Sequence, residues 1–227
     1  MTNMQNSEID LKKRIHQRET ISVVGGSTDM TETKLQELAA AGHDLLFIDG
    51  QHRPIDEKEL AACCKASAAA GLPVVLRIRH PDEAFLAGRY LDFGPLGIIV
   101  PMVERRETVL SAIEAFYYPP LGRRSWGPGN ALGWGQYAKD FPYAEWWNSH
   151  GVLMIQFESL PAILAAKDLI KPGVDVVVFG ECDLTLDLSA RPDAPFKTFE
   201  ECHQHVVKET EGMDVKIGAS NSPLGKL

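Results

Sequence analysis

Residues 45–79 read LLFIDGQHRPIDEKELAACCKASAAAGLPVVLRIR, with an apolar run on each side of an alanine-rich segment. The run 45–48 is continuously apolar and the run 73–78 is apolar except for Arg77, which is typical of strands buried on both faces of a parallel sheet. The segment between them, 56–70, has a helix-forming composition and stops at Gly71. This strand, helix, strand order predicts a parallel α/β fold.

The same alternation extends over most of the chain. The expected strands are 21–24, 45–48, 73–78, 97–100, 152–157, 174–179 and 215–218, and the expected helices are 56–70, 82–92, 106–116, 140–149, 160–170 and 198–210, with another after the first strand. Such alternation leaves two architectures, an open doubly wound sheet or a closed barrel. No GxGxxG follows the first strand, so the dinucleotide-binding fingerprint is absent.

The length of 227 residues suits one α/β domain, 1–227, slightly shorter than the roughly 250 residues of an eight-unit barrel. Residues 118–150 interrupt the alternation with prolines, glycines and aromatics. A long insertion of this kind is often a functional loop. The pattern ends after the seventh strand, so we expect a barrel that lacks about one β/α unit at its C-terminus.

Charge and composition exclude several classes of protein. The net charge of -8 argues against a nucleic-acid binder, which needs a basic face. No apolar run approaches the roughly 20 residues of a membrane span, and the polar N-terminus does not resemble a signal peptide. The four cysteines lack the spacing of a zinc or redox motif. We therefore expect a cytoplasmic protein that binds neither nucleic acid nor membrane.

Polar side chains follow the apolar runs at several expected strand ends. They are Asp49 and His52, Arg77 and Arg79, Gln156 and Glu158, Asp183, and the region of Ser220. A single charge after a strand is usually a solvated loop tip. In a barrel, however, the carboxyl ends of all strands meet at one mouth, where active sites lie.

Glu158 and Asp183 follow neighbouring strands and suit a hard divalent ion such as Mg²⁺ or Mn²⁺, which keeps waters and substrate oxygens as further ligands. The alternatives are a helix N-cap for Asp183 and an exposed charge for Glu158. His52 is a candidate general base, because histidine titrates near neutral pH.

Arg77 lies in an otherwise apolar run, where a charge is usually paired or binds an anion. Arg79 and His80 are expected to reach solvent. The segment 118–124, YPPLGRR, carries two arginines. It either gates the mouth or binds an anion, or else it forms a stiff surface loop or a subunit contact. Cys182 lacks an evident activating partner for thiol chemistry. We expect its side chain to pack against its neighbours or its backbone to make a contact.

Six motifs together resemble the HpcH/HpaI aldolase/citrate lyase family of metal-dependent pyruvate aldolases, such as 4-hydroxy-2-oxoheptanedioate aldolase. They are LLFIDGQH (45–52), PVVLR (73–77), YLDFG with IVPMV (90–94 and 99–103), YPPLGRR (118–124), MIQFES (154–159) and FGECDL (179–184). Their order and spacing cover roughly residues 20–220. The resemblance implies a TIM-like (β/α) barrel and a homo-oligomer.

The resemblance also implies roles for single residues. His52 is the expected general base, Asp92 the helix aspartate that raises its basicity, and Arg77 the group that stabilises the enolate. Because the spacing between Arg77 and Asp92 differs by one residue from the family pattern, Arg79 is an alternative to Arg77.

Glu158 and Asp183 correspond to the metal carboxylates, with Mg²⁺ or Mn²⁺ expected and Co²⁺ also compatible. Gln156, Asp183 and the backbone of Cys182 correspond to the groups that bind the 2-oxo acid.

The expected activity is that of an aldehyde-lyase that reversibly cleaves a 4-hydroxy-2-oxo acid into pyruvate and an aldehyde. Gln51 and Glu181 depart from the family motifs, which leaves a decarboxylase of an oxaloacetate-like acid as an alternative. The early end of the β/α pattern leaves a third reading, a degenerate barrel without catalysis.

Overall fold

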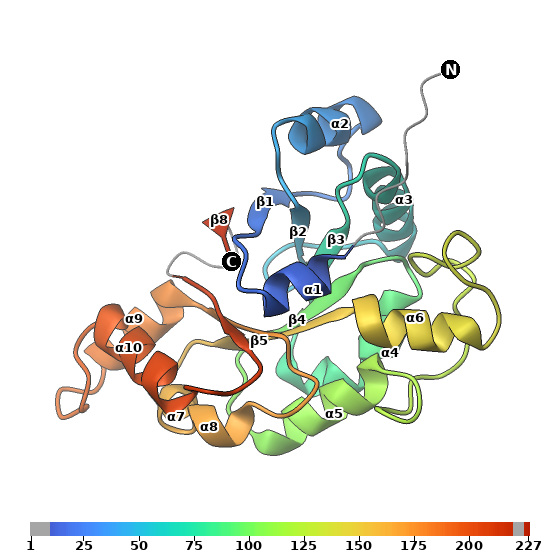
Figure 1. Cartoon of the computed structure of the whole chain (residues 1–227). Helices are drawn as coiled ribbons and strands as arrows, with labels where there is room; N and C mark the ends of the chain where they lie inside the picture. The colour runs from blue at the N-terminus through green and yellow to red at the C-terminus, as the bar shows by residue number, and fades with distance from the viewer. Residues whose placement is uncertain (1–9, 220–224) are drawn as a thin grey trace.

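The computed structural model describes residues 10–219 and 225–227, and within them seven parallel strands form one curled sheet (Figure 1). The strands are β1 Ser22–Gly26, β2 Leu45–Asp49, β3 Val74–Arg77, β4 Gly97–Val100, β5 Val152–Phe157, β6 Val176–Phe179 and β7 Lys216–Ile217. They lie side by side in chain order. A short strand, β8 Gly225–Lys226, pairs antiparallel with β1.

The helices surround this sheet. They are α1 Leu11–His16, α2 Glu32–Ala40, α3 Glu57–Ala69, the 3₁₀ helix η1 Pro81–Leu86, α4 Ala87–Leu91, α5 Arg106–Phe116, α6 Pro142–His150, α7 Leu160–Leu164, α8 Ala166–Leu169, α9 Glu181–Ser189 and α10 Phe199–Glu209.

The strand order distinguishes between the two predicted architectures. A doubly wound sheet reverses its strand order at a switch point, whereas here each strand pairs with the next one along the chain. All residues of β3, β4, β5 and β6 are buried, as expected for strands covered on both faces. The fold is therefore a parallel α/β fold with a curled, TIM-like half-barrel sheet. Among the described residues, no strand pairing joins β7 to β8.

Three segments differ from the predicted helices. The expected helix 160–170 is divided at Ala165 into α7 and α8, and the expected helix 82–92 begins as the 3₁₀ helix η1. Helix α9 was not predicted, and Asp183 lies in its first turn rather than at the strand end itself. The N-cap of α9 is Gly180, so the alternative of Asp183 as an N-cap is wrong.

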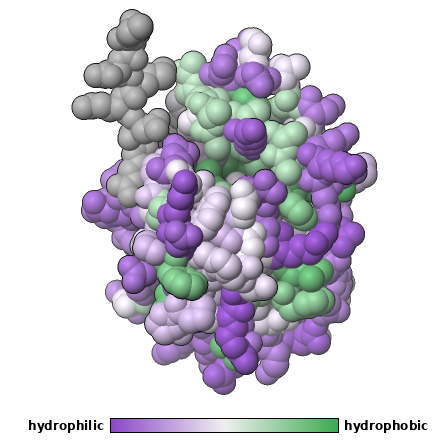
Figure 2. Space-filling model, turned by 90° about the vertical axis from the view of Figure 1, so that its right-hand side faces the viewer, coloured by the Kyte–Doolittle hydropathy of each residue, from purple (hydrophilic) through white to green (hydrophobic). Residues whose placement is uncertain are grey.

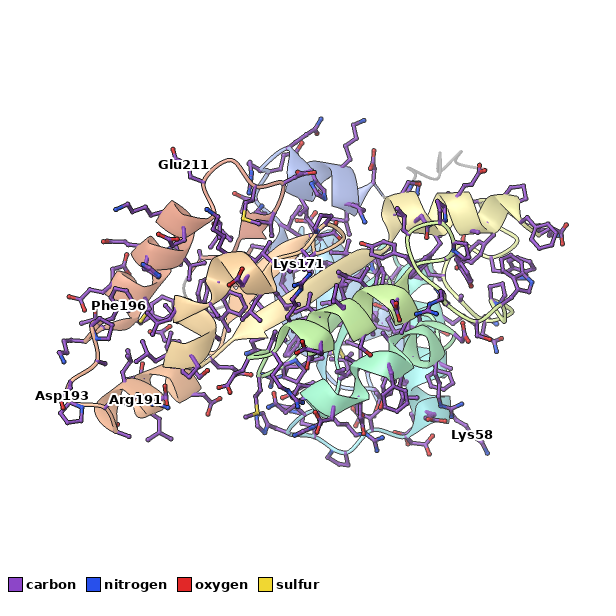
Figure 3. All side chains as sticks on the ribbon, turned by 90° about the horizontal axis from the view of Figure 1, so that it is seen from below. Lys58, Lys171, Arg191, Asp193, Phe196 and Glu211 are labelled. Atoms are coloured by element: carbon purple, nitrogen blue, oxygen red, sulfur yellow. The ribbon has the colours of Figure 1, made fainter. Side chains whose placement is uncertain are left out.

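The chain leaves α9 through a connection that contains Arg191, Asp193 and Phe196 and lies at the edge of the molecule (Figure 3). The predicted polar position at Ser220 and the tail at 221–224 lie outside the described residues. No helix in the described part of the chain is long and apolar enough to cross a membrane.

Helix α1 lies across the amino end of the curled sheet, opposite the strand ends that carry the candidate site (Figure 1). Arg14 pairs with Asp44, just before β2, at 2.7 Å, and His16 contacts Asp175, just before β6, at 2.9 Å. Arg18, which follows the helix, donates to the backbone carbonyl of residue 215, just before β7. These contacts hold a helix that has only two buried apolar residues.

The insertion at 118–150 packs as an aromatic cluster around the fully buried Tyr143 and Trp147. Trp126 and Phe141 remain 44% and 80% exposed. Figure 2 faces the side that carries α3 and α6, where green hydrophobic surface lies next to paler surface. The insertion is thus an ordered part of the fold with some apolar surface left uncovered.

Candidate active site

Asp49 and Arg77 form a two-point ion pair at the carboxyl ends of β2 and β3. The strand register places the two residues directly opposite each other. Arg77 donates from Nε to Asp49 Oδ1 at 3.0 Å and from Nη2 to Oδ2 at 2.8 Å. Partial burial would raise the pKa of Asp49, but the Arg77 hydrogen bonds and charge outweigh it and hold that pKa below its ordinary value. Asp49 is therefore an anionic anchor that fixes the guanidinium.

The same aspartate organises the loop that carries His52. Asp49 Oδ1 accepts the backbone N–H groups of Gln51 at 3.0 Å and of His52 at 3.4 Å, in the manner of an Asx turn. His52 is exposed, and its imidazole makes no hydrogen bond or ion pair with a described residue. The fold thus places the His52 backbone beside Arg77 and leaves the ring accessible at the mouth.

Gln156, near the carboxyl end of strand β5, connects Arg77 to the candidate metal carboxylate. Arg77 Nη1 donates to Gln156 Oε1 at 3.3 Å, and Gln156 Nε2 donates to Glu158 Oε2 at 3.1 Å. The amide is buried, and both of its polar atoms are used. A continuous polar chain therefore runs from Asp49 to Glu158 across the ends of four neighbouring strands.

Glu158 is a buried carboxylate, 4% exposed, held by a backbone of unusual conformation. The N–H of Met102 donates to Glu158 Oε1 at 2.7 Å, and Met102 has a φ of 48°, in the left-handed region that non-glycine residues rarely adopt. Burial is the main cause that raises the pKa of Glu158 to about 7, and the nearby Asp183 adds to it. The alternative of an exposed charge at Glu158 is wrong.

Gly180 and Asp183 complete this corner of the site. A Cβ on Gly180 would overlap the carboxylate of Glu158, so only glycine leaves room for that side chain. Asp183 is exposed at the start of α9 and near enough to hydrogen-bond with Glu158. Among the described residues, no third His, Cys, Asp or Glu joins them in a cluster. Two carboxylates with open positions fit a hard divalent cation that takes further oxygens from water and substrate.

The other predicted site residues lie apart from this chain of contacts. Asp92 pairs with Arg124 at 2.6 Å, and no hydrogen bond or ion pair joins Asp92 to His52 among the described residues. Burial raises the pKa of Asp92 even though Arg124 lowers it. Cys182 is exposed, so the expectation that its side chain packs is wrong.

Arg79 and Arg124 are both paired with an acidic residue. Arg79 is exposed and pairs with Glu83 at 2.9 Å. Arg124, from the YPPLGRR segment, is buried, and its guanidinium lies over the rings of Tyr118 and Trp147 at 4.9 and 4.6 Å. This arginine helps to fasten the insertion to the barrel and does not line the mouth.

Three further residues support the site and carry only weak sequence signals. Asp49 stood out as a polar strand end, but its double contact with Arg77 and the His52 loop depends on strand register. Met102 acts through its backbone, which its side chain does not reveal. Gly180 follows β6 as many loop glycines do, and only the position of Glu158 explains it.

Comparison with known proteins adds three findings. The profile of the HpcH/HpaI aldolase/citrate lyase family matches residues 27–218. The chain is 34% identical over 159 residues to a hydroxypyruvate/pyruvate aldolase of Roseovarius nubinhibens, covering 69% of this chain but only 61% of that relative. It is 28% identical to a 2-keto-3-deoxy-L-rhamnonate aldolase of Salmonella gallinarum, covering 92% of this chain and 76% of the relative.

Among solved structures, the fold is similar to an HpcH/HpaI aldolase from Desulfitobacterium hafniense DCB-2. The TM-score is 0.77 at 26% identity, and the match covers 91% of this chain and 80% of the other.

Proposed function

The chain belongs to the HpcH/HpaI aldolase/citrate lyase family, and from this premise we propose that it is a metal-dependent aldehyde-lyase that reversibly cleaves a 4-hydroxy-2-oxo acid into pyruvate and an aldehyde. The relatives named as hydroxypyruvate/pyruvate and 2-keto-3-deoxy-L-rhamnonate aldolases support a pyruvate aldolase function. The observation that carries the proposal is the polar chain from Asp49 through Arg77 and Gln156 to Glu158.

Glu158 and Asp183 are the proposed metal ligands. A divalent ion such as Mg²⁺, Mn²⁺ or Co²⁺ supplies Lewis acidity to the 2-oxo acid when bound. The raised pKa of Glu158 supports this assignment, because a bound cation stabilises the charged form of a buried carboxylate that lies beside a second carboxylate.

The start of α9 is the proposed cradle for the carboxylate of the 2-oxo acid. The first N–H groups of a helix have no carbonyl partner within it and favour an anion. Helix α9 begins at Glu181, so the N–H of Cys182 belongs to this set, next to Asp183. Gln156 borders the same corner and limits how the acid can turn.

Arg77 is proposed to donate a hydrogen bond to the oxygen that becomes negative as the enolate forms. Its Nε and Nη2 are fixed by Asp49, so the guanidinium is already oriented before substrate binds. Preorganised donors of this kind stabilise developing charge without a reorganisation cost.

His52 is proposed as the general base that removes the proton of the 4-hydroxyl group. The C3–C4 bond then breaks, its electron pair forms the enolate of pyruvate, and an aldehyde leaves. Protonation at C3 gives pyruvate. The proposed role of Asp92, to raise the basicity of His52, has no support from a contact within this chain.

Pyruvate release from a 4-hydroxy-2-oxo acid tests the proposal. We expect release that depends on Mn²⁺ and that falls by about 10²-fold or more in His52→Ala, the usual worth of a general base. The control is His80→Ala, because His80 is also exposed but follows the neighbouring strand and contacts Asp82. Absence of release with every metal, or equal rates for all three proteins, would contradict the proposal. Release of CO₂ from oxaloacetate alone would identify a decarboxylase.

We also propose that residues 1–227 form one barrel domain with an insertion at about 118–150, and that the protein is a cytoplasmic homo-oligomer. The exposed Trp126 and Phe141 on the insertion support a self-association surface, since large exposed apolar side chains that cluster are often interface residues.

A further inference from the structure

A cavity of about 440 Å³ opens beside the Asp49–Arg77 pair, and neither Glu158 nor Asp183 lines it. Its walls come from the carboxyl ends of the first three strands: Gly25, Gly26, Ser27, Met30, Phe47, Asp49, Arg53 and Arg77. Its volume is within the range of small-ligand pockets. Because Asp49 and Arg77 belong both to this cavity and to the polar chain that leads to Glu158, the cavity continues the candidate site away from the metal carboxylates.

The charges in the cavity wall do not balance. Asp49 and Arg77 neutralise each other through their two hydrogen bonds. Arg53 is exposed in the wall and makes no hydrogen bond or ion pair with a described residue. Asp29, the acidic residue of the loop after β1, is hydrogen-bonded to Ser27 and is not part of the wall. One surplus positive charge therefore faces the cavity.

Phe47 and Met30 supply the apolar part of the wall. Phe47 is buried, and Met30 lies against Gly26, where a Cβ would meet Leu46 and Met30 at 2.7 and 2.9 Å. Such a surface suits a short aliphatic segment. The guanidinium of Arg53 presents a fork of N–H donors that matches a carboxylate or a similar oxyanion.

We propose that Arg53 is a specificity-determining residue that selects acceptor aldehydes carrying an anionic group at the end remote from the carbonyl. This proposal rests on the aldolase function proposed above. In the addition direction, the pyruvate enolate lies between Arg77 and the metal carboxylates. The aldehyde carbonyl then meets it near Arg77, the short chain of the aldehyde lies along Phe47, and its oxyanion pairs with Arg53.

The test compares 4-oxobutanoate with its methyl ester as acceptors for pyruvate in the presence of Mn²⁺. The two aldehydes share the four-carbon chain, and the ester replaces the terminal carboxylate by an uncharged group that is larger by one methyl. We expect the native protein to favour the anion in kcat/KM by about tenfold, the usual worth of a hydrogen-bonded charge. Arg53→Ala should remove most of this preference, mainly by raising KM for the anion. Arg53→Lys should keep part of it, and Arg53→Glu should favour the ester.

Arg105→Ala is the matched control, because Arg105 is also an exposed arginine after a strand but does not line the cavity and pairs with Asp82. Its charge preference should equal that of the native protein. A native protein without a preference, or an Arg53→Ala protein that loses both acceptors equally, would overturn the proposal.

A separate measurement distinguishes failure of this inference from failure of the proposed function. Exchange of the methyl protons of pyruvate with D₂O requires enolisation but no aldehyde. Metal-dependent exchange without product from either acceptor would overturn the role of Arg53 and leave the pyruvate chemistry standing. Absence of metal-dependent exchange in the native protein would overturn both.

Discussion

Replacement of Glu158 by Gln is expected to stabilise the metal-free protein at alkaline pH. Burial and the neighbouring Asp183 raise the pKa of Glu158 from 4.5 to about 7 in the folded state. A carboxyl group with a raised folded pKa contributes stability below its unfolded pKa, and that contribution is lost as the pH rises through the folded value. Ionised Glu158 therefore destabilises the metal-free fold above about pH 7.

The magnitude follows from the pKa and the contacts. The rise from 4.5 to about 7 corresponds to roughly 3 kcal/mol of unfolding free energy at pH 8. The amide of the variant can still accept from Met102, but its NH₂ group faces the NH₂ group of Gln156, which costs about 1 kcal/mol. A net gain of about 2 kcal/mol corresponds to about 4–8 °C in Tm for a chain of this size.

Thermal melting in EDTA at pH 5 and pH 8, and then with excess Mn²⁺, measures this effect. Glu158→Gln should melt higher than the native protein at pH 8 and lose that advantage at pH 5. Mn²⁺ should raise the Tm of the native protein more than that of the variant, because one ligand is weakened. Glu211→Gln, at an exposed position near the edge of the molecule (Figure 3), is the control and should change neither melt. A variant that melts below the native protein in EDTA at pH 8, or an equal Mn²⁺ shift in both, would refute the reasoning.

Three further predictions follow from other contacts. Gly180→Ala should reduce Mn²⁺-dependent pyruvate release by about 10²-fold while the circular dichroism spectrum stays native, because the new Cβ displaces the Glu158 carboxylate. The control is Gly129→Ala, where a Cβ meets nothing within 4 Å and which should keep the native rate. Equal rates for the two variants would argue against this role of Gly180. Asp49→Asn should lower the unfolding free energy in urea by about 3 kcal/mol, because Arg77 loses a buried partner, and a change below about 0.5 kcal/mol would contradict a structural ion pair. The hydrogen bond to Asp175, and then that to Asp214, raise the pKa of His16. The difference in unfolding free energy between the native protein and His16→Gln should therefore be greatest below pH 6.5 and shrink as the pH rises through the raised pKa. A difference in urea unfolding that does not change with pH would speak against a charged His16.

The sequence predicted the strands better than the polar elements around them. The run 97–100 is apolar throughout and the run 152–157 is apolar except for Gln156, so their burial and parallel direction follow from composition. Helix α1 has only Leu11 and Ile15 as buried residues and is held by ion pairs to distant strand starts, which no local pattern reveals. Helix α9 is short and weakly amphipathic, so the turn that carries Asp183 resembled a loop.

The sequence predicted the site residues whose side chains lie at the end of a strand. It did not predict contacts that are made by a backbone group or by a partner far away in the chain. The positions of Arg77, Gln156 and Glu158 follow from the strand pattern, and the structure brings them into one chain of hydrogen bonds. The pairing of Asp92 with Arg124 joins a helix end to the insertion, across 32 residues of sequence. Such a contact depends on how the insertion folds back, which neither periodicity nor spacing determines.

The position of α1 has a mechanical consequence for the open edge of the sheet. Its contacts, and those of the residues just after it, join the starts of β2, β6 and β7, while among the described residues no strand pairing joins β7 to β8. The edge strands β7 and β8 are therefore linked through the residues of and after α1 at the amino end, whereas the described residues show no strand pairing between them. A change in the distance between these two edges is therefore restrained by α1 at the amino end, which is the end opposite the candidate site.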